Sequence, residues 1–324
     1  MNSLRLRDIE EKVLAGRTLL KKDARYLSTL SGQDAIDLSC SANRVRRHFR
    51  GNAVDLCSIV NAKSGKCPED CAYCAQSSKS SAKIAAYALL EKKAVIEKAR
   101  EAKKGGAKRF CIVTSGKRVS GKELYAIADM VSSVRSTGLL PCATLGLLTG
   151  EDLQVLKKAG LERYHNNLET SERYFSSICS TLSYEEKVST IYSARDSGLS
   201  VCSGGIFGIG ETWQDRIDMA YALRAIGPDS VPINFFTPIQ GTKLGRRRPL
   251  APLEALKIIS IYRFILPDKQ IRVCGGRLQT LGELNPFIFL AGADGLLIGN
   301  YLTTLGRGYE EDLIMIKNLG FTAA

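Results

Sequence analysis

From about residue 54 to its end, the chain alternates short apolar runs with longer amphipathic stretches. Short runs of this composition are typical of buried strands, and the longer stretches repeat apolar residues with helical spacing. Eight runs have the character of strands: Val54–Ala62, Arg109–Thr114, Leu140–Leu145, Leu161–Leu168, Ser200–Phe207, Val231–Phe236, Gln270–Cys274 and Gly295–Ile298. Alternating units of this kind predict parallel β–α–β connections, and eight of them predict an α/β fold closed as a (β/α)8 TIM-type barrel.

The stretches between these strands predict helices, several of which follow a Ser, Thr or Gly that could begin them. The clearest are Ala82–Lys104, Ser120–Ser136, Tyr184–Ser197, Thr212–Ala225 and Leu253–Leu266. Residues 1–50 are also helical in pattern, and we expect them to form an N-terminal helical extension covering one end of the barrel. Residues 51–324 would be the barrel, and the whole chain one compact domain.

Composition narrows the functional class only slightly. The 324 residues are 44% hydrophobic, with no apolar run long enough to span a bilayer and a charged, helical N-terminus, so we expect a cytoplasmic protein with no membrane partner. Lys and Arg number 46 against 33 Asp and Glu, an excess that could serve RNA, a membrane surface or an acidic substrate. Apart from the run Arg246–Arg248, the basic residues are scattered and not interleaved with aromatic residues, which favours a solvated surface and no nucleic acid partner.

Three of the ten cysteines stand close together after the first strand, as C-P-E-D-C-A-Y-C at Cys67, Cys71 and Cys74. In a cytosolic chain, cysteines are better interpreted as metal ligands than as a disulfide framework. Three thiolates without a fourth Cys or His nearby suit a [4Fe-4S] cubane with one open iron; a zinc knuckle and a chance cluster of buried thiols are the alternatives. This spacing resembles the signature of the radical S-adenosylmethionine (SAM) superfamily. The resemblance implies that the open iron binds SAM, that one electron cleaves SAM to a 5'-deoxyadenosyl radical, and that Tyr73 lies near the adenine.

A glycine-rich run, G-x-I-x-G-x-x-E, stands at the end of the fifth strand, with Gly204, Ile206, Gly208 and Glu211. Missing side chains would let a nucleoside approach the backbone there. A dinucleotide fingerprint is excluded because the spacing G-x-G-x-x-G is absent. In radical SAM enzymes this pattern borders the adenine site, so the resemblance implies SAM contacts for Gly204, Gly205 and Ile206.

Four further cysteines fall on different predicted strands, at Cys111, Cys142, Cys202 and Cys274. Inward-facing residues of a barrel stack in layers, so these four thiols can converge on one interior metal cluster. A single buried cysteine is usually just a small apolar side chain, but four together favour metal. Cys40, Cys57 and Cys179 are interpreted as structural or incidental.

The segments N-A-K-S-G-K-C-P-E-D-C-A-Y-C-A-Q-S-S, Y-H-N-N-L-E-T-S, V-C-S-G-G-I-F-G-I-G-E-T and S-V-P-I-N-F resemble those of the biotin synthase family, over about residues 40–310. The resemblance implies a radical SAM sulfurtransferase that converts dethiobiotin to biotin, taking sulfur from an auxiliary [2Fe-2S] cluster held by three cysteines and an arginine. Cys111, Cys142, Cys202 and Arg272 match those four positions. No acid–base pair is expected, and no catalytic residue beyond the cluster ligands.

One position departs from the family pattern, because Cys274 stands two residues after Arg272, where a Ser or another small residue is usual. The two side chains share a face of the strand, and a thiolate is a far better iron ligand than a guanidinium. Our hypothesis is that Cys111, Cys142, Cys202 and Cys274 hold the auxiliary cluster, which is [2Fe-2S] or larger, with Arg272 as the alternative ligand.

The same resemblance implies where SAM and substrate are held. Asn167 and Glu169 alternate with Leu168 and so share one face; the matching family residues contact the ureido ring and bridge toward the SAM ribose. The family acid is usually Asp, and Glu169 is one methylene longer. His165 and Asn166 stand in an order other than the family's, so no role is carried over to them. Residues matching substrate-contact positions are Lys63, Asn234, Thr303 and Thr304.

The expected partners are dethiobiotin, an external one-electron donor of the flavodoxin or ferredoxin type, and a second copy of the chain in a homodimer. Three alternatives remain open at this point. The first is another radical SAM reaction, such as hydrogenase-cluster maturation or a carbon-skeleton rearrangement. The second is an RNA-thiolating enzyme, and the third is a non-catalytic cluster carrier or zinc scaffold.

Overall fold

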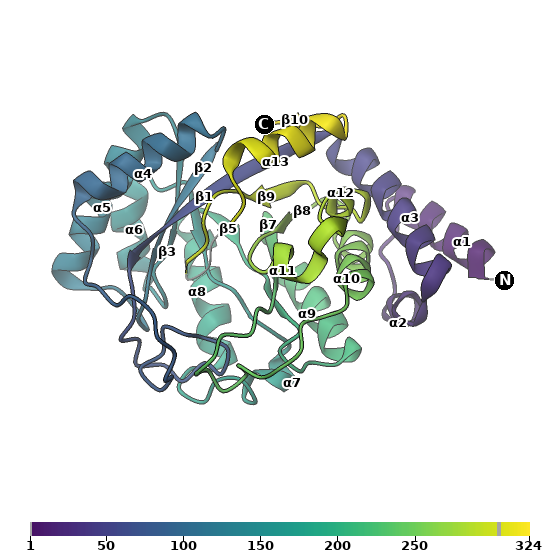
Figure 1. The fold of residues 1–324 in the computed structure, drawn as a ribbon, viewed down its shortest axis with the longest axis horizontal. Helices are drawn as coiled ribbons and strands as arrows, with labels where there is room; N and C mark the ends of the chain where they lie inside the picture. The colour runs from purple at the N-terminus through teal and green to yellow at the C-terminus, as the bar shows by residue number, and fades with distance from the viewer. Residues whose placement is uncertain (1, 303–305) are drawn as a thin grey trace.

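The computed structural model describes residues 2–302 and 306–324, and within them eight parallel strands close into a barrel (Figure 1). In barrel order the strands are β1 (Ala53–Lys63), β2 (Arg109–Thr114), β3 (Leu140–Thr144), β4 (Arg163–His165), β5 (Ser200–Cys202), β7 (Ser230–Phe235), β8 (Gln270–Val273) and β9 (Gly295–Leu297). The pairing of β9 with β1 completes the ring. Two short strands lie outside it: β6 (Gly205–Phe207) pairs with β7, and β10 (Thr322–Ala323) pairs with β1. The predicted TIM-type barrel is confirmed.

The fifth strand was predicted as one continuous strand, Ser200–Phe207, and this is wrong, because the structure has two short strands there. It is divided into β5 and β6 because the chain passes Pro232 of β7 at very close range at Gly204, where an added Cβ would lie 2.0 Å from the Pro232 carbonyl oxygen. The predicted fourth strand also shrinks to Arg163–His165, and beyond it the chain reaches Glu169 with a positive φ of 71°. These two breaks aim the following residues at the mouth of the barrel.

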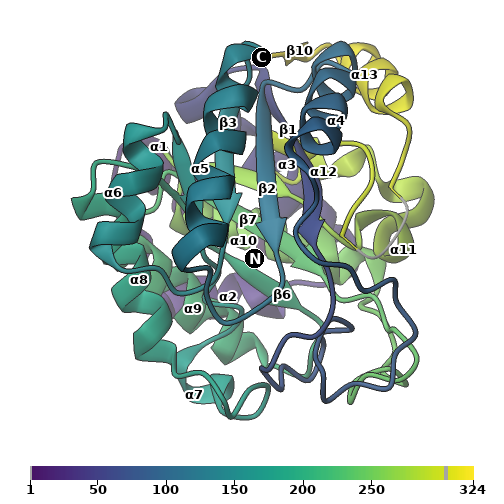
Figure 2. The same ribbon diagram turned by 90° about the vertical axis from the view of Figure 1, so that its left-hand side faces the viewer.

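Outer helices follow most strands (Figure 2). They are α4 (Lys92–Lys104), α5 (Gly121–Ser136), α6 (Gly150–Lys158), α7 (Glu172–Phe175), α8 (Tyr184–Asp196), α9 (Trp213–Ile226), α10 (Pro252–Ile265), α11 (Arg277–Leu281), η1 (Gly282–Leu284), α12 (Phe287–Leu290) and α13 (Tyr309–Asn318). Four of the five predicted helices agree to within one residue at each end. The fifth, predicted from Ala82, begins only at Lys92, because Tyr87 pairs its backbone N–H and carbonyl with Ser64 and holds this segment extended.

Three helices form the N-terminal part of the chain: α1 (Asn2–Leu14), α2 (Lys21–Thr29) and α3 (Gly32–Arg50). Helix α3 packs along α10 and α12, whereas α2 contacts α9 and α10. Leu38 and Ala42 of α3 are fully buried in these contacts. The extension therefore lies beside outer helices of the barrel (Figure 1), and its predicted position over one end of the barrel is wrong.

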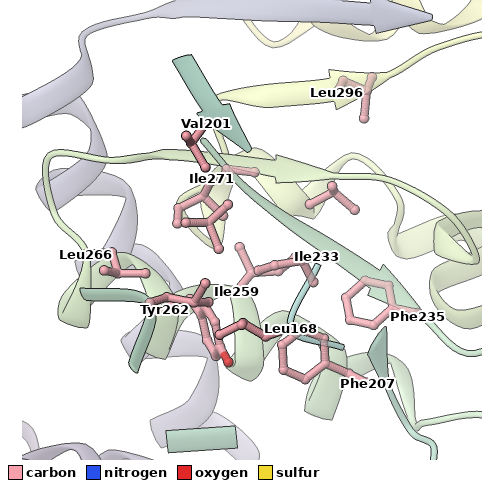
Figure 3. Close-up of a cluster of buried hydrophobic side chains, with 14 of the residues drawn as sticks. Leu168, Val201, Phe207, Ile233, Phe235, Ile259, Tyr262, Leu266, Ile271 and Leu296 are labelled. Atoms are coloured by element: carbon pink, nitrogen blue, oxygen red, sulfur yellow. The ribbon is translucent and has the colours of Figure 1, made fainter. Parts of the chain in front are cut away.

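The apolar core lies between the barrel and its helices (Figure 3). Val201, Ile271 and Leu296 project outward from their strands toward this layer, and α10 contributes Ile259 and Tyr262. All five are nearly inaccessible to solvent. Because successive side chains of a strand point to opposite faces, an aliphatic outer face leaves the inner face of the barrel available for polar and sulfur-containing side chains.

Candidate active site

A cavity of ≈ 360 Å³ occupies the inside of the barrel and is called the chamber below. Five cysteines line it in the described part of the chain: Cys57, Cys111, Cys142, Cys202 and Cys274. They come from β1, β2, β3, β5 and the end of β8, and none is in a disulfide. The strand register explains part of this convergence, since Cys111 is paired directly with Cys142 across β2 and β3.

The four cysteines predicted to converge therefore do line one chamber, and Cys57, interpreted as incidental, lines it as well. Cys57, Cys111, Cys142 and Cys274 also belong to one contact cluster, separate from the main core. Burial raises the pKa of all five thiols, that of Cys274 to about 12, so they are neutral without a metal. A group of soft donors in a water-poor space suits an iron–sulfur cluster, whose binding would displace these protons.

Beneath the thiols lies an arginine-rich layer, which we call the floor of the chamber. Arg272 binds the Asp55 carboxylate and donates to the Asp55 and Leu296 carbonyl oxygens at 3.1 and 3.2 Å. Arg109 donates from Nε to the same carboxylate at 3.1 Å. Although burial alone would raise the pKa of Asp55, Arg272 and Arg109 hold this pKa well below its usual value. Asp55 is therefore ionised and shared between two guanidinium groups.

A third arginine joins this floor through a neutral partner. Arg163 donates to Gln270 Oε1 at 3.1 Å, and Arg272 donates to the same oxygen at 2.8 Å. Among the residues described, the three arginines of the floor thus have one carboxylate to compensate them. Arg109 Nη1 is buried without a hydrogen-bond partner. An excess of positive charge and a spare donor fit an anionic group above the floor.

Above the thiols, a row of polar side chains connects Thr144 to Glu169. Thr144 Oγ1 lies 2.8 Å from His165 Nδ1, and His165 Nε2 lies 2.7 Å from Asn167 Oδ1. Asn167 then donates from Nδ2 to Glu169 Oε2 at 3.3 Å. Burial lowers the pKa of His165 to about 4, so the ring is neutral and can donate from Nε2 while accepting at Nδ1. The row holds the Asn167 amide in one orientation.

His165 and Thr144 were missed as site residues. No role was given to His165 because His165 and Asn166 stand in an order other than the family's. Its spacing from Asn167 could have predicted that it faces the chamber, because residues i and i+2 of a strand share a face. Thr144 Oγ1 also lies 3.5 Å from Cys111 Sγ. The row therefore reaches from a chamber thiol to the mouth of the barrel.

The loop between β1 and α4 carries Cys67, Cys71 and Cys74, each partly exposed. Asp70 fixes this loop to residues 178–181: its carboxylate accepts from the Ser180 N–H at 2.8 Å and the Ser180 hydroxyl at 2.6 Å. Ala72 donates its N–H to the Ile178 carbonyl at 2.7 Å. Hydrogen bonds from Ser180 hold the pKa of Asp70 well below its usual range. The loop is thus a fixed platform.

No three His, Cys, Asp or Glu side chains of residues 2–302 and 306–324 converge closely enough to hold a single metal ion. A zinc knuckle needs such convergence, whereas the ligands of a cubane bind different iron atoms and stand farther apart. The neighbour of Cys71 is Cys179, 3.6 Å away between sulfur atoms. Cys179 was also interpreted as incidental, and it belongs to the segment that Asp70 fixes.

The glycine run has a role in packing the backbone of the barrel, beside the predicted contacts with SAM. An added Cβ at Gly205 would lie 2.5 Å from the Glu169 carbonyl oxygen, so protein already fills this space. Glu211 accepts from the Gly208 and Gly210 N–H groups at 2.9 and 3.0 Å and pairs with Arg216 at 2.7 Å, which fixes the turn. Of the run, Ile206 lines the chamber.

Some of the remaining predicted site residues line the chamber and others do not. Tyr73, Asn167, Glu169 and Asn234 line the chamber. Asn234 is already occupied, since Nδ2 donates to the Gly205 carbonyl at 3.2 Å and Oδ1 accepts from the Gly275 N–H at 3.0 Å. The structure does not bring Lys63 to the chamber lining, because its ammonium pairs with Glu123 at 2.8 Å. Thr303 and Thr304 lie outside the described residues.

Comparison with known proteins agrees with this architecture. The model of the "Radical SAM superfamily" matches residues 62–222. The crystal structure of a methylornithine synthase superposes with a TM-score of 0.85 at 22% identity, covering 98% of this chain and 97% of that one. The FeFe-hydrogenase maturase HydG from Carboxydothermus hydrogenoformans gives 0.82 at 16% identity, covering 98% and 79%. At these identities the two structures show the fold alone. Barrel, cysteine loop and family model together define a radical SAM enzyme.

The relatives in sequence are more specific. The "Biotin and Thiamin Synthesis associated domain" matches residues 232–322. The biotin synthase of Thermodesulfovibrio yellowstonii is 53% identical over 279 residues, which is 86% of this chain and 88% of the relative. That of Geotalea daltonii is 45% identical over 323 residues, covering 99% and 98%. The chain belongs to the biotin synthase family.

The expected activity is therefore confirmed: the chain is a radical SAM enzyme that inserts sulfur into dethiobiotin to give biotin. Its cofactors are a [4Fe-4S] cluster, SAM and an auxiliary iron–sulfur cluster. Within the described ranges, no helix is both long and apolar enough to cross a bilayer.

Proposed function

We propose that the chamber and the loop above it divide the reaction between them. The observation that carries this assignment is the convergence of five buried thiols over an arginine-rich floor, directly inside a barrel whose mouth carries the Cys-x3-Cys-x2-Cys loop. Cys67, Cys71 and Cys74 hold the [4Fe-4S] cluster, whose open iron takes SAM. When bound, that cluster and SAM would supply a 5'-deoxyadenosyl radical, and an auxiliary cluster in the chamber would supply the sulfur that enters dethiobiotin.

Cys111, Cys142, Cys202 and Cys274 hold the auxiliary cluster, which is [2Fe-2S] or larger. The contacts of Arg272 support this ligand set over the alternative, because its guanidinium is already bound to the Asp55 carboxylate and to two carbonyl oxygens. A protonated guanidinium whose two terminal nitrogens already donate to the protein has no lone pair to offer iron. Arg272 instead contributes positive charge next to the anionic cluster.

The nucleoside of SAM is held at the mouth by Tyr73, Glu169, Gly204, Gly205 and Ile206. Glu169 supports this role because its positive φ turns the chain toward the chamber opening, where Tyr73 and Ile206 also lie. Gly204 and Gly205 act through their backbone, since protein fills the space beside them. The Glu169 carboxylate would accept hydrogen bonds from ribose hydroxyls, which a carboxylate does well in a water-poor site.

Dethiobiotin occupies the chamber between the two clusters, with Asn167 and Asn234 beside its ureido ring. The row from Thr144 through His165 supports Asn167, because it orients the amide before substrate binds. Lys63, Thr303 and Thr304 would contact the other end of the substrate, and Lys63 would have to leave Glu123 to do so. The apolar packing around the barrel would help to keep water from a reactive radical.

We also propose the finer partners and location: a flavodoxin- or ferredoxin-type donor supplies the electron, the chain forms a homodimer, and it acts in the cytoplasm. Residues 1–50 are an extension of the single barrel domain at 51–324. The buried face of α3 supports one compact unit.

The test is a single-turnover reaction of anaerobically reconstituted protein with SAM, dithionite and dethiobiotin, followed by mass spectrometry. Biotin and 5'-deoxyadenosine are expected together, with a monothiolated intermediate at early times. Deoxyadenosine without a thiolated product would refute the chamber as the sulfur source. No deoxyadenosine from protein with full iron content would refute the assignment of the cysteine loop.

A further inference from the structure

The outer side of the cysteine loop carries a concentration of positive charge that the reaction itself does not use. This loop and the loop between β7 and α10 carry seven exposed basic side chains, and we call them the basic rim: Lys66, Lys79, Lys83, Lys243, Arg246, Arg247 and Arg248. In residues 61–90 and 236–250, which contain the rim, the acidic residues are Glu69, which is buried, and Asp70. Lys243 lies 3.7 Å from Asp70, and the other six have no ion pair with a described residue.

Two loops far apart in sequence build this rim. The loop between β1 and α4 lies beside the loop between β7 and α10 in both views (Figures 1 and 2). Ser81 and Ser80 donate to the Gly241 carbonyl at 3.0 Å, and Leu244 donates its N–H to the Ala72 carbonyl at 3.2 Å. The two loops are therefore joined, and their charges act as one patch.

A shallow recess opens through the rim toward the cluster ligands. Cys71 and Cys74 line it, and so do Lys79 and Lys243. Two of the three loop thiols and two basic residues of the rim therefore line the same small recess. Electron transfer between proteins falls steeply with distance, so a carrier seated here would be close to the cluster that it reduces.

We propose that the basic rim is the docking site of a small acidic protein that carries one electron. This inference rests on the proposed function of Cys67, Cys71 and Cys74. In the step, one electron passes from the reduced carrier to the cluster at those thiols, the carrier is oxidised by one electron, and no atom is transferred. Attraction between a basic patch and an acidic carrier speeds association and fixes its orientation.

A nucleic acid is the other polyanion that a basic surface could bind, but the rim does not offer a stacking platform. In residues 61–90 and 236–250, which the structure describes throughout, Tyr87 is the exposed aromatic residue, whereas Tyr73 faces the chamber and Phe236 is buried. Single-stranded nucleic acids are held by several aromatic side chains that alternate with basic ones. The position over the cluster ligands favours the electron carrier.

The test uses the reconstituted full chain and flavodoxin hydroquinone as the carrier. The rim variant combines Lys79→Glu, Lys243→Glu and Arg246→Glu. The matched control combines Arg17→Glu, Lys22→Glu and Lys104→Glu, which are exposed residues outside the rim. Both triple variants lower the net charge equally. Stopped-flow absorbance follows reduction of the cluster, and titration at low salt measures the Kd for flavodoxin.

We expect the rim variant to raise the Kd and slow reduction by flavodoxin roughly tenfold to a hundredfold, with a difference that shrinks in high salt. Reduction by dithionite should be unchanged, and the control should resemble the parent. Equal losses in both variants, or no loss in the rim variant, would overturn the docking site. So would a rim variant that loses RNA binding while it keeps its affinity for flavodoxin.

Two further measurements keep these outcomes interpretable. If the rim variant does not load iron fully, Arg246→Glu with Arg248→Glu replaces it, since both side chains lie outside the cysteine loop. If the parent chain produces no 5'-deoxyadenosine with dithionite, the proposed function of the loop has failed. If the parent chain does produce 5'-deoxyadenosine with dithionite, but flavodoxin reduces the rim variant as fast as the parent, only the proposed docking site has failed.

Discussion

The chamber and the loop above it position their cysteine thiols in two different ways. Chamber thiols such as Cys111 and Cys142 stand on neighbouring strands, where ladder hydrogen bonds fix the backbone and register sets which side chains meet. The loop thiols stand on irregular backbone without ladder hydrogen bonds. Hydrogen bonds from Ser180 to the Asp70 carboxylate hold this backbone in place. Strands give a deep, dry site with exact placement, whereas the loop gives access to the surface. A reaction that needs a protected sulfur source and an external electron uses both.

The largest expected effect is a loss of the loop's function while the chamber keeps its cluster. Cys71→Ala should lower 5'-deoxyadenosine formation below detection, because the [4Fe-4S] cluster loses one of three ligands, while the auxiliary cluster retains its iron. The measurement is deoxyadenosine yield with dithionite, together with iron and sulfide content. Cys179→Ala is the matched control, since its sulfur lies 3.6 Å from that of Cys71 without belonging to the ligand set. Equal loss in both variants would mean that the loop assignment is wrong.

A substitution in the chamber should have the opposite result, a loss of the chamber's function while the loop remains active. Cys274→Ser should remove the auxiliary iron and abolish biotin formation while deoxyadenosine formation continues. Mössbauer spectra and product analysis measure the two properties. Cys57→Ser is the control, because it changes another thiol of the same chamber. Normal auxiliary iron in Cys274→Ser, combined with its loss in Arg272→Lys, would identify the arginine as the ligand.

The floor of the chamber predicts a large effect on stability. Asp55→Asn should lower the free energy of unfolding of the metal-free chain by about 3 to 5 kcal/mol, because Arg272 and Arg109 lose their shared carboxylate. Urea denaturation measures this change. Glu123→Gln, which breaks the more exposed pair with Lys63, should cost about 1 kcal/mol or less. Similar values for both variants would show that the floor does not depend on Asp55.

The smallest expected effect concerns pH and the row above the thiols. The pKa of His165 is lowered to about 4 in the folded chain, whereas an unfolded histidine titrates near 6.5. The unfolded state therefore binds more protons in this window, and stability falls as the pH falls from about 6.5 to 4, by up to roughly 3 kcal/mol. In metal-free protein, His165→Gln should make the stability profile flatter over that range. An identical slope in both proteins would contradict a neutral, buried His165.

The sequence was sufficient for features that repeat with a fixed spacing. The period of the strands predicted the barrel, and the spacing of Cys67, Cys71 and Cys74 predicted the loop. Placing four cysteines near the centres of different strands was enough to predict that they line one chamber. Helix α4 was the exception, because the backbone pairing of Tyr87 with Ser64 outweighs the helical pattern before Lys92.

The interactions between strands could not be predicted in the same way. Asp55 meets Arg272 and Arg109 only because β1 lies between β9 and β2 in a closed ring. The register of the closed barrel decides which residues of different strands lie at the same level along its axis. Cys57 was dismissed because a single buried cysteine carries little information by itself. The division of the fifth strand depended on a close approach to Pro232, which is a property of the packed barrel.

The arginine-rich floor has one further consequence. In the metal-free chain the thiols are neutral, so the two positive charges that Asp55 does not compensate have no counter-ion among the residues that the structure describes. Under the proposed ligand set, the anionic auxiliary cluster would supply that counter-ion, which would link loading of the barrel to the stability of the fold. Each sulfur atom given to substrate dismantles part of it. On this assignment the enzyme would weaken its own scaffold as it works, and its survival between turnovers would depend on how soon the cluster is rebuilt.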